Sequence, residues 1–282
     1  MMMLKVAAAA AAITFTASTL YAQTPAPAPT PKSKQSAPRA KPAAPQRAPS
    51  SGKTLCVASA LGGNFNLQTI GFTVFGNDVQ TAPIDSWGLD DLAVRKTASI
   101  VSGRFTVRRI SMPPGTLADF RRPLGGILFG NRTPGLDGAI QTLAAANPGC
   151  NFYMLLTRTF TRFESSNQNI EGIGLLNREN PLFERRWLHA LFTVRLIDGQ
   201  SREVVRSEMG RLDVNQNSGL VGIYGASRQV EKSWWPASPQ AVAQNAQLRN
   251  ATHALIEQAL TVTLRNMFDP GATPPSPMVE RD

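Results

Sequence analysis

The fold of this chain is decided by residues 187–209, WLHALFTVRLIDGQSREVVRSEM. Apolar and β-branched residues dominate Trp187–Ile197, and a second, shorter run covers Glu203–Met209, as is typical of strands. Between the two runs the chain reads Asp-Gly-Gln-Ser over residues 198–201, and Asp-Gly in this position is a strong signal for a β-hairpin. The stretch therefore predicts two antiparallel strands.

Short apolar runs rich in β-branched and aromatic residues predict further strands at Leu55–Ala58, Ile70–Phe75, Phe105–Val107 and Phe152–Phe163. Apolar residues at helical spacing predict a helix from Leu89 to Ile100. Asp90 and Asp91 suit its first turn, where carboxylates face free amide groups. A short helix is predicted over Leu136–Ala146, after a Pro- and Gly-rich loop at Met112–Pro134.

The last predicted element is a long helix, for which Ser238 is the candidate N-cap and Pro239 the candidate first residue. Its apolar residues recur every seven positions, at Ala241, Leu248, Leu255 and Val262. A helix of about 30 residues with this stripe is expected to pack along a sheet. The element order β-β-α-β-α-β-β-β-α predicts an α+β fold, with a mixed or antiparallel sheet packed by the C-terminal helix.

The first 22 residues have the pattern of a cleaved export signal. Lys5 supplies the positive start, Val6–Leu20 is uncharged, and Ala22 ends a small-residue cleavage site, so the mature chain is expected to begin at Gln23. The uncharged run is shorter than the roughly 20 apolar residues of a transmembrane helix, and no later segment is long enough. We therefore expect a periplasmic protein with no transmembrane helix after signal cleavage.

Residues 23–52 are rich in Pro, Ala and basic residues and contain no carboxylate, which predicts a disordered linker. Residues 53–270 are expected to form a single α+β domain, followed by a disordered tail at 271–282. The linker holds five cations and the signal one, so the chain from Lys53 onward carries +4 of the formal charge of +10. The linker is either a spacer or a contact to anionic wall polymers, and an exported chain is not expected to bind nucleic acid.

The chain has two cysteines, Cys56 and Cys150. In an oxidising compartment such a pair is a candidate disulfide, and the alternative is two buried thiols that pack as small apolar residues. A bond between them would close a loop of roughly 100 residues and stabilise the fold by about 4 to 5 kcal/mol in the chain-entropy model.

Arginines crowd the strand predicted at Phe105–Val107 and the loop that follows it. They are Arg104, Arg108, Arg109, Arg121, Arg122 and Arg132. If the loop folds back beside the strand, they form an anion-binding patch; the alternative is a solvated strand edge whose charges discourage aggregation. Trp234 and Trp235 precede the last helix, and they form either an exposed aromatic contact or a lid over the core.

The hairpin at residues 190–205 resembles that of a group of periplasmic α+β domains, in which an alternating strand ends in Asp and the returning strand opens with two aliphatic residues. The group includes the amino-terminal domain of the Tol translocation protein, the curli-secretion lipoprotein and the lipoprotein activators of penicillin-binding proteins. The helix that leads through Gly103 into Phe105–Val107 and the long closing helix are also similar. Ser201-Arg202 stands where the group has a Thr-Gly-like pair, and the lipid-bearing cysteine is absent. The resemblance implies a non-enzymatic envelope protein.

The sequence marks no catalytic, cofactor-binding or metal-binding residue. His189 and His253 have no second His or Cys at ligand spacing, and no Gly-x-Ser-x-Gly motif occurs. We therefore expect a binding or assembly module for another envelope protein or an anionic cell-wall polymer. The alternative is a periplasmic hydrolase whose catalytic carboxylates lie outside any sequence motif.

Overall fold

The computed structural model describes residues 52–71, 76–120, 133–163, 168–180, 183–213 and 223–269. The expected signal peptide, most of the expected linker and the expected tail lie outside these residues. The strands are β1 (Thr54–Ala60), β2 (Asn64–Ile70), β3 (Asp78–Pro83), β4 (Thr106–Arg109), β5 (Phe152–Arg158), β6 (Phe160–Arg162), β7 (Asn169–Glu171), β8 (Ile173–Asn180), β9 (Phe183–Ala190), β10 (Phe192–Asp198), β11 (Val204–Met209) and β12 (Ala226–Val230). The helices are α1 (Leu89–Val101), α2 (Leu136–Ala146) and α3 (Ala246–Phe268), with short 3-10 turns η2 (Asp85–Trp87), η3 (Lys232–Trp234) and η4 (Pro239–Ala241).

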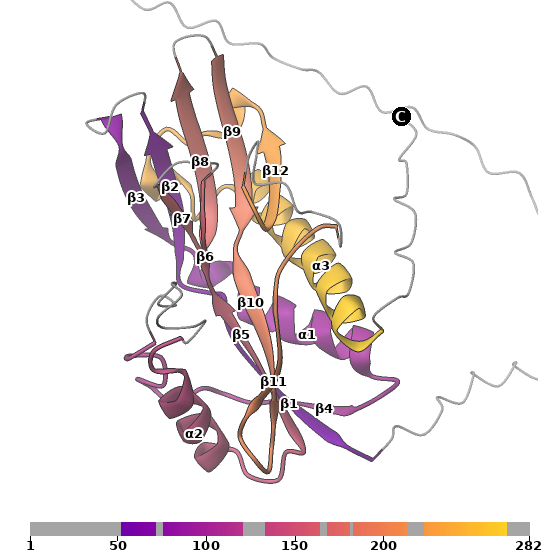
Figure 1. The fold of residues 1–282 in the computed structure, drawn as a ribbon. Coiled ribbons are helices and arrows are strands. Elements are labelled where there is room, and N and C mark those ends of the chain that lie inside the picture. The colour runs from indigo at the N-terminus through magenta and orange to yellow at the C-terminus, as the bar shows by residue number, and fades with distance from the viewer. Residues whose placement is uncertain are drawn as a thin grey trace, which may run out of the picture. The chain divides into compact units, whose positions relative to one another are not determined.

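The strands form two mixed five-stranded sheets and one small ribbon (Figure 1). The first, which we call the β1 sheet, has the order β11-β10-β5-β1-β4, and the second, the β2 sheet, has the order β12-β9-β8-β2-β3. β1 is parallel to both of its neighbours, whereas β10 is antiparallel to both β5 and β11. The expected α+β class, with a mixed sheet packed by the C-terminal helix, is confirmed.

Two strand pairs pass from one sheet into the other. β1 continues into β2 through residues 61–63, and β9 continues into β10 through Leu191, so that β9 and β10 follow one line in Figure 1. Three backbone hydrogen bonds hold the second junction. The amide of Thr159 donates to the carbonyl of Leu191 (3.0 Å), that of Leu191 to Gly172 (2.8 Å) and that of Gly172 to Thr159 (2.8 Å). The two sheets are therefore joined through their backbones.

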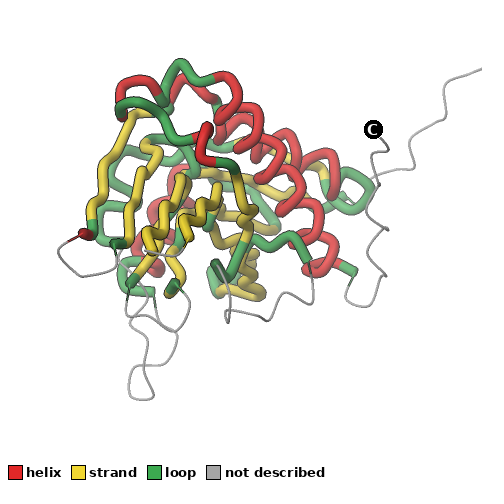
Figure 2. The backbone as a smooth tube through the Cα atoms, turned by 90° about the horizontal axis from the view of Figure 1, so that it is seen from above, coloured by secondary structure: helices red, strands yellow, loops and turns green. Residues whose placement is uncertain are grey.

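Successive residues of β1 face different layers, because side chains alternate along a strand. Leu55 and Val57 belong to the main core with α1 and α3, which pack against each other. Cys56 and Ala58 point to the opposite face, where they meet residues of α2. Figure 1 shows α2 apart from the α1 and α3 pair, and Figure 2 shows helices lying along one side of the strands.

The structure joins Cys56 and Cys150 in a disulfide, with their Cα atoms 5.8 Å apart. Cys56 lies in β1, and Cys150 comes just before β5, its parallel neighbour in the sheet. Both cysteines belong to the apolar layer under α2. Of the two alternatives for these cysteines, the structure shows the disulfide.

Asp90, in the first turn of α1, holds the chain where β1 turns into β2. One of its carboxylate oxygens, Oδ1, accepts hydrogen bonds from Ser59 Oγ (2.7 Å), Leu61 N (2.6 Å) and Gly62 N (3.2 Å). The carbonyl of Leu61 accepts from Arg158 through Nε (3.0 Å) and Nη2 (2.7 Å). A Cβ atom at Gly62 would lie 2.7 Å from the other oxygen of Asp90, so a larger residue here would have to displace this hydrogen-bonded carboxylate. The crossing is thus held from both sides.

The structure corrects how the helix starts are capped. Asp90 and Asp91 lie in the first turn of α1 as expected, but the N-cap is Gly88, and Asp91 forms an ion pair with Arg109. α3 begins later than predicted, at Ala246, where the side chain of Asn245 accepts from the amide of Leu248 (3.0 Å). The expected N-cap Ser238 and the Pro239 after it instead lead into the 3-10 turn η4. Asn245 therefore caps the helix in place of Ser238, because an Asn side chain is an equally good N-cap and lies directly before the first helical turn.

Three predicted strands are also corrected. The strand at residues 187–197 is two strands, which break at Leu191 because each belongs to a different sheet. The strand at residues 152–163 breaks likewise at Thr159. β2 ends at Ile70, where a strand was expected to begin, and residues 72–75 lie outside those described.

Within the described residues, no helix combines the length and the hydropathy that a membrane crossing requires.

The Asp90→Ala variant is expected to lower the free energy of unfolding by about 3 kcal/mol, since it leaves partly buried amides without an ionised acceptor. Asp91→Ala is the matched control. It removes a carboxylate from the same helix turn, but it breaks only an exposed ion pair and is expected to cost at most about 1 kcal/mol. Urea unfolding of both variants measures the difference, and equal losses would contradict the role assigned to Asp90.

Candidate binding groove

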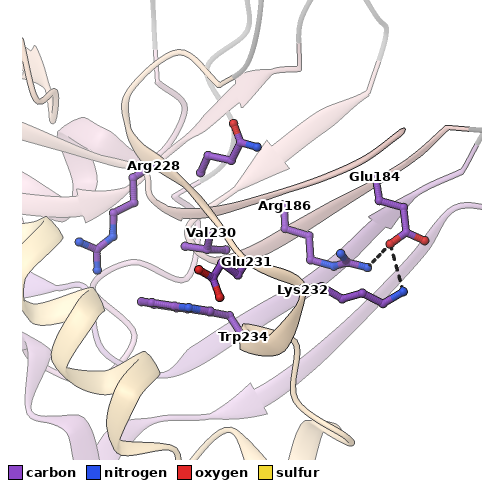
Figure 3. A pocket seen from close by; sticks show the side chains of 8 residues that line it. Glu184, Arg186, Arg228, Val230, Glu231, Lys232 and Trp234 are labelled. Carbon is purple, nitrogen blue, oxygen red and sulfur yellow. Dashed lines mark hydrogen bonds and ion pairs between the residues drawn. The ribbon is translucent and has the colours of Figure 1, made fainter. Parts of the chain in front are cut away.

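An open groove of about 710 Å³ lies at one end of the β2 sheet, where β9, β12 and η3 meet (Figure 3). Its walls combine cations, carboxylates and one aromatic ring. The lining residues are Glu184, Arg186, Arg228, Gln229, Val230, Glu231, Lys232 and Trp234.

The register of β9 and β12 explains how the groove is built. The strands are antiparallel, with Arg228 opposite Leu188 and Val230 opposite Arg186, so these four side chains share the face that is turned toward α3. After β12 the chain turns through η3, where the amide of Trp234 donates to the carbonyl of Glu231 (3.2 Å). The turn brings the Trp234 ring back beside the strand.

Arg228 and Trp234 form a cation–π pair, with the guanidinium 5.6 Å from the ring centroid. The Arg228 side chain is exposed, and no carboxylate of the described residues pairs with it. The nearest carboxylate in sequence, Glu231, accepts instead from Ser233 Oγ (3.3 Å). This wall therefore presents a planar cation beside an aromatic face.

The opposite wall carries the buried side chain of Arg186. Its Nη2 donates to Glu184 Oε2 at 2.9 Å, and Lys232 Nζ lies 3.3 Å from the same oxygen. The hydrogen bond from Arg186, followed by that from Lys232, holds the pKa of Glu184 below its ordinary value. Glu184 is thus the shared ion-pair partner of Arg186 and Lys232.

One polar atom of this wall and one on the neighbouring strand have no hydrogen-bond partner. They are Nε of Arg186 and Oδ1 of Asn177, which stands directly opposite Arg186 on β8. Both residues are buried, with 8% and 6% of their surfaces exposed. An unsatisfied buried polar group costs about 1 to 3 kcal/mol, so a native structure usually keeps one for a reason other than stability.

The three arginines of the expected anion patch that the structure describes have separate partners. Arg104 pairs with Asp269, Arg109 pairs with Asp91, and Arg108 donates to the carbonyl of Pro148 (2.7 Å) and lies against the disulfide sulfurs. Arg108 and Arg109 also point to opposite faces of β4, because they are neighbours in one strand. Arg121, Arg122 and Arg132 lie outside the described residues. The described arginines do not converge on one point.

The two tryptophans lie beside each other between the core and the surface. Trp234 lines the groove, and both Trp234 and Trp235 are half-buried against the main core. Arg186 and Arg228 were not among the site residues predicted from the sequence. The signal for Arg186 was present, since three consecutive charged residues, 184–186, directly precede the apolar pair Trp187-Leu188.

Neither histidine lies in the groove. His189 is fully buried in β9, and its Nδ1 donates to the carbonyl of Gly172 (3.0 Å), while its Nε2 has no partner. Burial lowers the pKa of His189 to about 4, and the nearby charge of Arg158 acts in the same direction. His253 on α3 contacts the carbonyl of Trp87 at 2.9 Å. The described residues contain no cluster of three His, Cys, Asp or Glu side chains that could hold a metal ion.

We expect His189 to make stability depend on pH. Its pKa is about 4 in the folded protein and 6.5 ordinarily, so the unfolded chain takes up a proton that the folded chain resists. The contribution of neutral His189 to the free energy of unfolding is fully present above pH 6.5. It is lost as the pH falls toward 4, and the total loss is about 3 kcal/mol. Urea unfolding between pH 7 and pH 4.5 should show a shallower pH dependence for His189→Gln than for the unmodified chain or for His253→Gln. Identical pH dependences for all three proteins would contradict this expectation.

No protein-family model matches this chain, and no curated protein matches it. Among solved structures, one similar chain is a protein of Xanthomonas campestris whose crystal structure is described under the family model DUF330. The two are 13% identical, with a TM-score of 0.32, and the match covers 79% of this chain and 92% of the other.

Proposed function

We propose that this protein is an exported, non-enzymatic binding module of the bacterial envelope, and that the groove between β9, β12 and η3 is where it contacts its partner. The observation that carries the proposal is the pairing of Arg228, which has no carboxylate partner among the described residues, with the face of Trp234. Trp and Arg side chains supply much of the free energy at protein interfaces, because each combines a large apolar surface with a directional polar group.

The proposed location in the envelope rests on the amino-terminal signal pattern and on the disulfide. The Lys5 start, the uncharged run and Ala22 have the order of a cleaved signal. The Cys56–Cys150 bond supports this location, because disulfides persist mainly in oxidising compartments. The linker that follows the signal would let the folded domain reach away from its point of export.

The partner is another envelope protein or an anionic polymer of the cell wall. Three cations and two carboxylates line the groove, and the folded domain as a whole is cationic. These charges favour a partner that presents carboxylate or phosphate groups beside an apolar part for Trp234. The resemblance of the β10–β11 hairpin to non-enzymatic periplasmic domains is in line with a binding role.

The proposal is tested in the native bacterium with a photo-reactive amino acid placed at Gln229, an exposed residue of β12. Val79, which is 58% exposed on the opposite edge strand of the same sheet, is the matched control position. The Gln229 probe should form an adduct with one envelope protein or with peptidoglycan, and the Val79 probe should not. Adding Arg228→Glu or Trp234→Ala should reduce that adduct roughly tenfold or more.

Arg162→Glu makes the same charge change on β6, away from the groove, and should leave the adduct unchanged. Equal adducts from both positions, no adduct from Gln229, or full adduct formation by the groove variants would each refute the proposal. The enzyme alternative would be favoured if the purified mature chain hydrolysed peptidoglycan and one Asp or Glu substitution abolished that activity.

A further inference from the structure

Among the described residues, no strand pairs with the outer side of β12. β12 is the last strand of the β2 sheet, and on its inner side it pairs with β9. The amide of Ala226 donates to the carbonyl of Gly210 (3.0 Å), so the backbone groups of this residue point away from β9. Backbone groups alternate in direction along an antiparallel edge strand. Those of Arg228 and Val230 therefore also point outward.

The amides and carbonyls of Arg228 and Val230 meet no further strand among the described residues. Two residues with one donor and one acceptor each offer four hydrogen-bonding groups along this edge. Such a row is a template for another strand, and folded proteins usually cover it, break it or use it for binding.

The groove reaches this edge. Three consecutive residues of β12, Arg228, Gln229 and Val230, line it together with Trp234. Because side chains alternate between the two faces of a sheet, a groove that meets three residues in succession follows the strand rather than one face. The edge and the groove are therefore one continuous surface, with the Trp234 ring at one side.

The cations along this surface favour an added strand that carries acidic side chains. Arg228 and Lys232 lie along the same stretch of chain, and the only carboxylate that Lys232 meets among the described residues is Glu184, which it shares with Arg186. An acidic side chain on the added strand would pair with Arg228, while an apolar neighbour would rest against Trp234 and Val230. A second copy of this chain would bring its own Arg228 and Lys232 to an edge that already carries both cations, whereas an acidic strand would bring carboxylates to them.

We infer that an extended acidic segment of a partner protein adds to β12 as a further strand of the β2 sheet. The inference rests on the proposed binding function and narrows its partner to a polypeptide, because strand addition requires regularly spaced amides and carbonyls that a glycan does not supply.

The probes are two synthetic peptides that alternate Val with either Glu or Lys, each with blocked ends and seven residues long. Each peptide is titrated into the mature chain, and binding is monitored through the amide signals in NMR. The Glu peptide should bind about tenfold more tightly than the Lys peptide. It should also slow hydrogen exchange at the amides of Arg228 and Val230. Arg228→Glu should reverse the preference between the peptides, and Arg162→Glu should preserve it.

The backbone contact is tested separately from the charge. Val230→Pro removes an outward N–H and leaves the ladder to β9 intact, whereas Val230→Ala keeps that N–H. Peptide binding should be lost in the first variant and retained in the second, with both variants melting cooperatively. A Glu peptide N-methylated at alternate residues should not bind the unmodified chain.

Equal binding of the methylated peptide, equal binding by the two Val230 variants, or dimerisation of the chain through β12 in ultracentrifugation would overturn the inference. If these peptides fail while the Gln229 adduct with an envelope component still forms, strand addition is wrong and the binding function stands. If that adduct is also missing, both are wrong.

Discussion

The carboxylate of Asp90 and the guanidinium of Arg158 both hydrogen-bond to the backbone of Leu61, where β1 becomes β2. Asp90 accepts from its amide, and Arg158 donates to its carbonyl. This contact decides the architecture, because β1 must leave one sheet at Leu61 and enter the other as β2. The carboxylate belongs to α1, so the same contact also fixes the start of the helix that packs with α3. Burial lowers the pKa of Arg158 below its ordinary value, and the charges of Asp90 and then Asp85 oppose part of that shift.

The groove follows from this arrangement through the order of the strands. β2 is paired with β8, β8 with β9 and β9 with β12, so the position of β2 determines where β12 and the turn after it are placed. The main core under α1 and α3 is apolar, yet beside η3 the same face of the sheet carries Arg186 and Asn177 with unsatisfied atoms. Other buried atoms, such as Nε2 of His189, also have no partner, but Arg186 lines the groove together with Arg228 and Trp234. We assign binding to this end of the molecule because these three side chains meet there.

The sequence predicted those elements whose signal is local. The hairpin of β10 and β11 forms as expected, with Asp198 Oδ1 accepting from the amides of Gln200 (2.9 Å) and Ser201 (2.8 Å), and α2 has the predicted bounds. The break at Leu191 was not predictable, because apolar residues continue through it and only the pairing partners change. At Thr159 the β-branched residues Thr157, Thr159 and Thr161 continue to favour a strand, so the sequence shows no break there either. The groove was also missed. Arg228 and Trp234 are six positions apart in sequence, and it is the turn at η3 that brings them together.

The central claim is that the crossing held by Asp90 and Arg158 makes the two sheets a single cooperative unit. Native-state hydrogen exchange of the mature chain tests this most directly, because it measures an opening free energy for each protected amide. The account predicts that the protected amides of β1, β5 and β10 and those of β2, β8 and β9 open with the same free energy, to within about 1 kcal/mol. A β2 sheet that opens several kcal/mol more easily than the β1 sheet would contradict it.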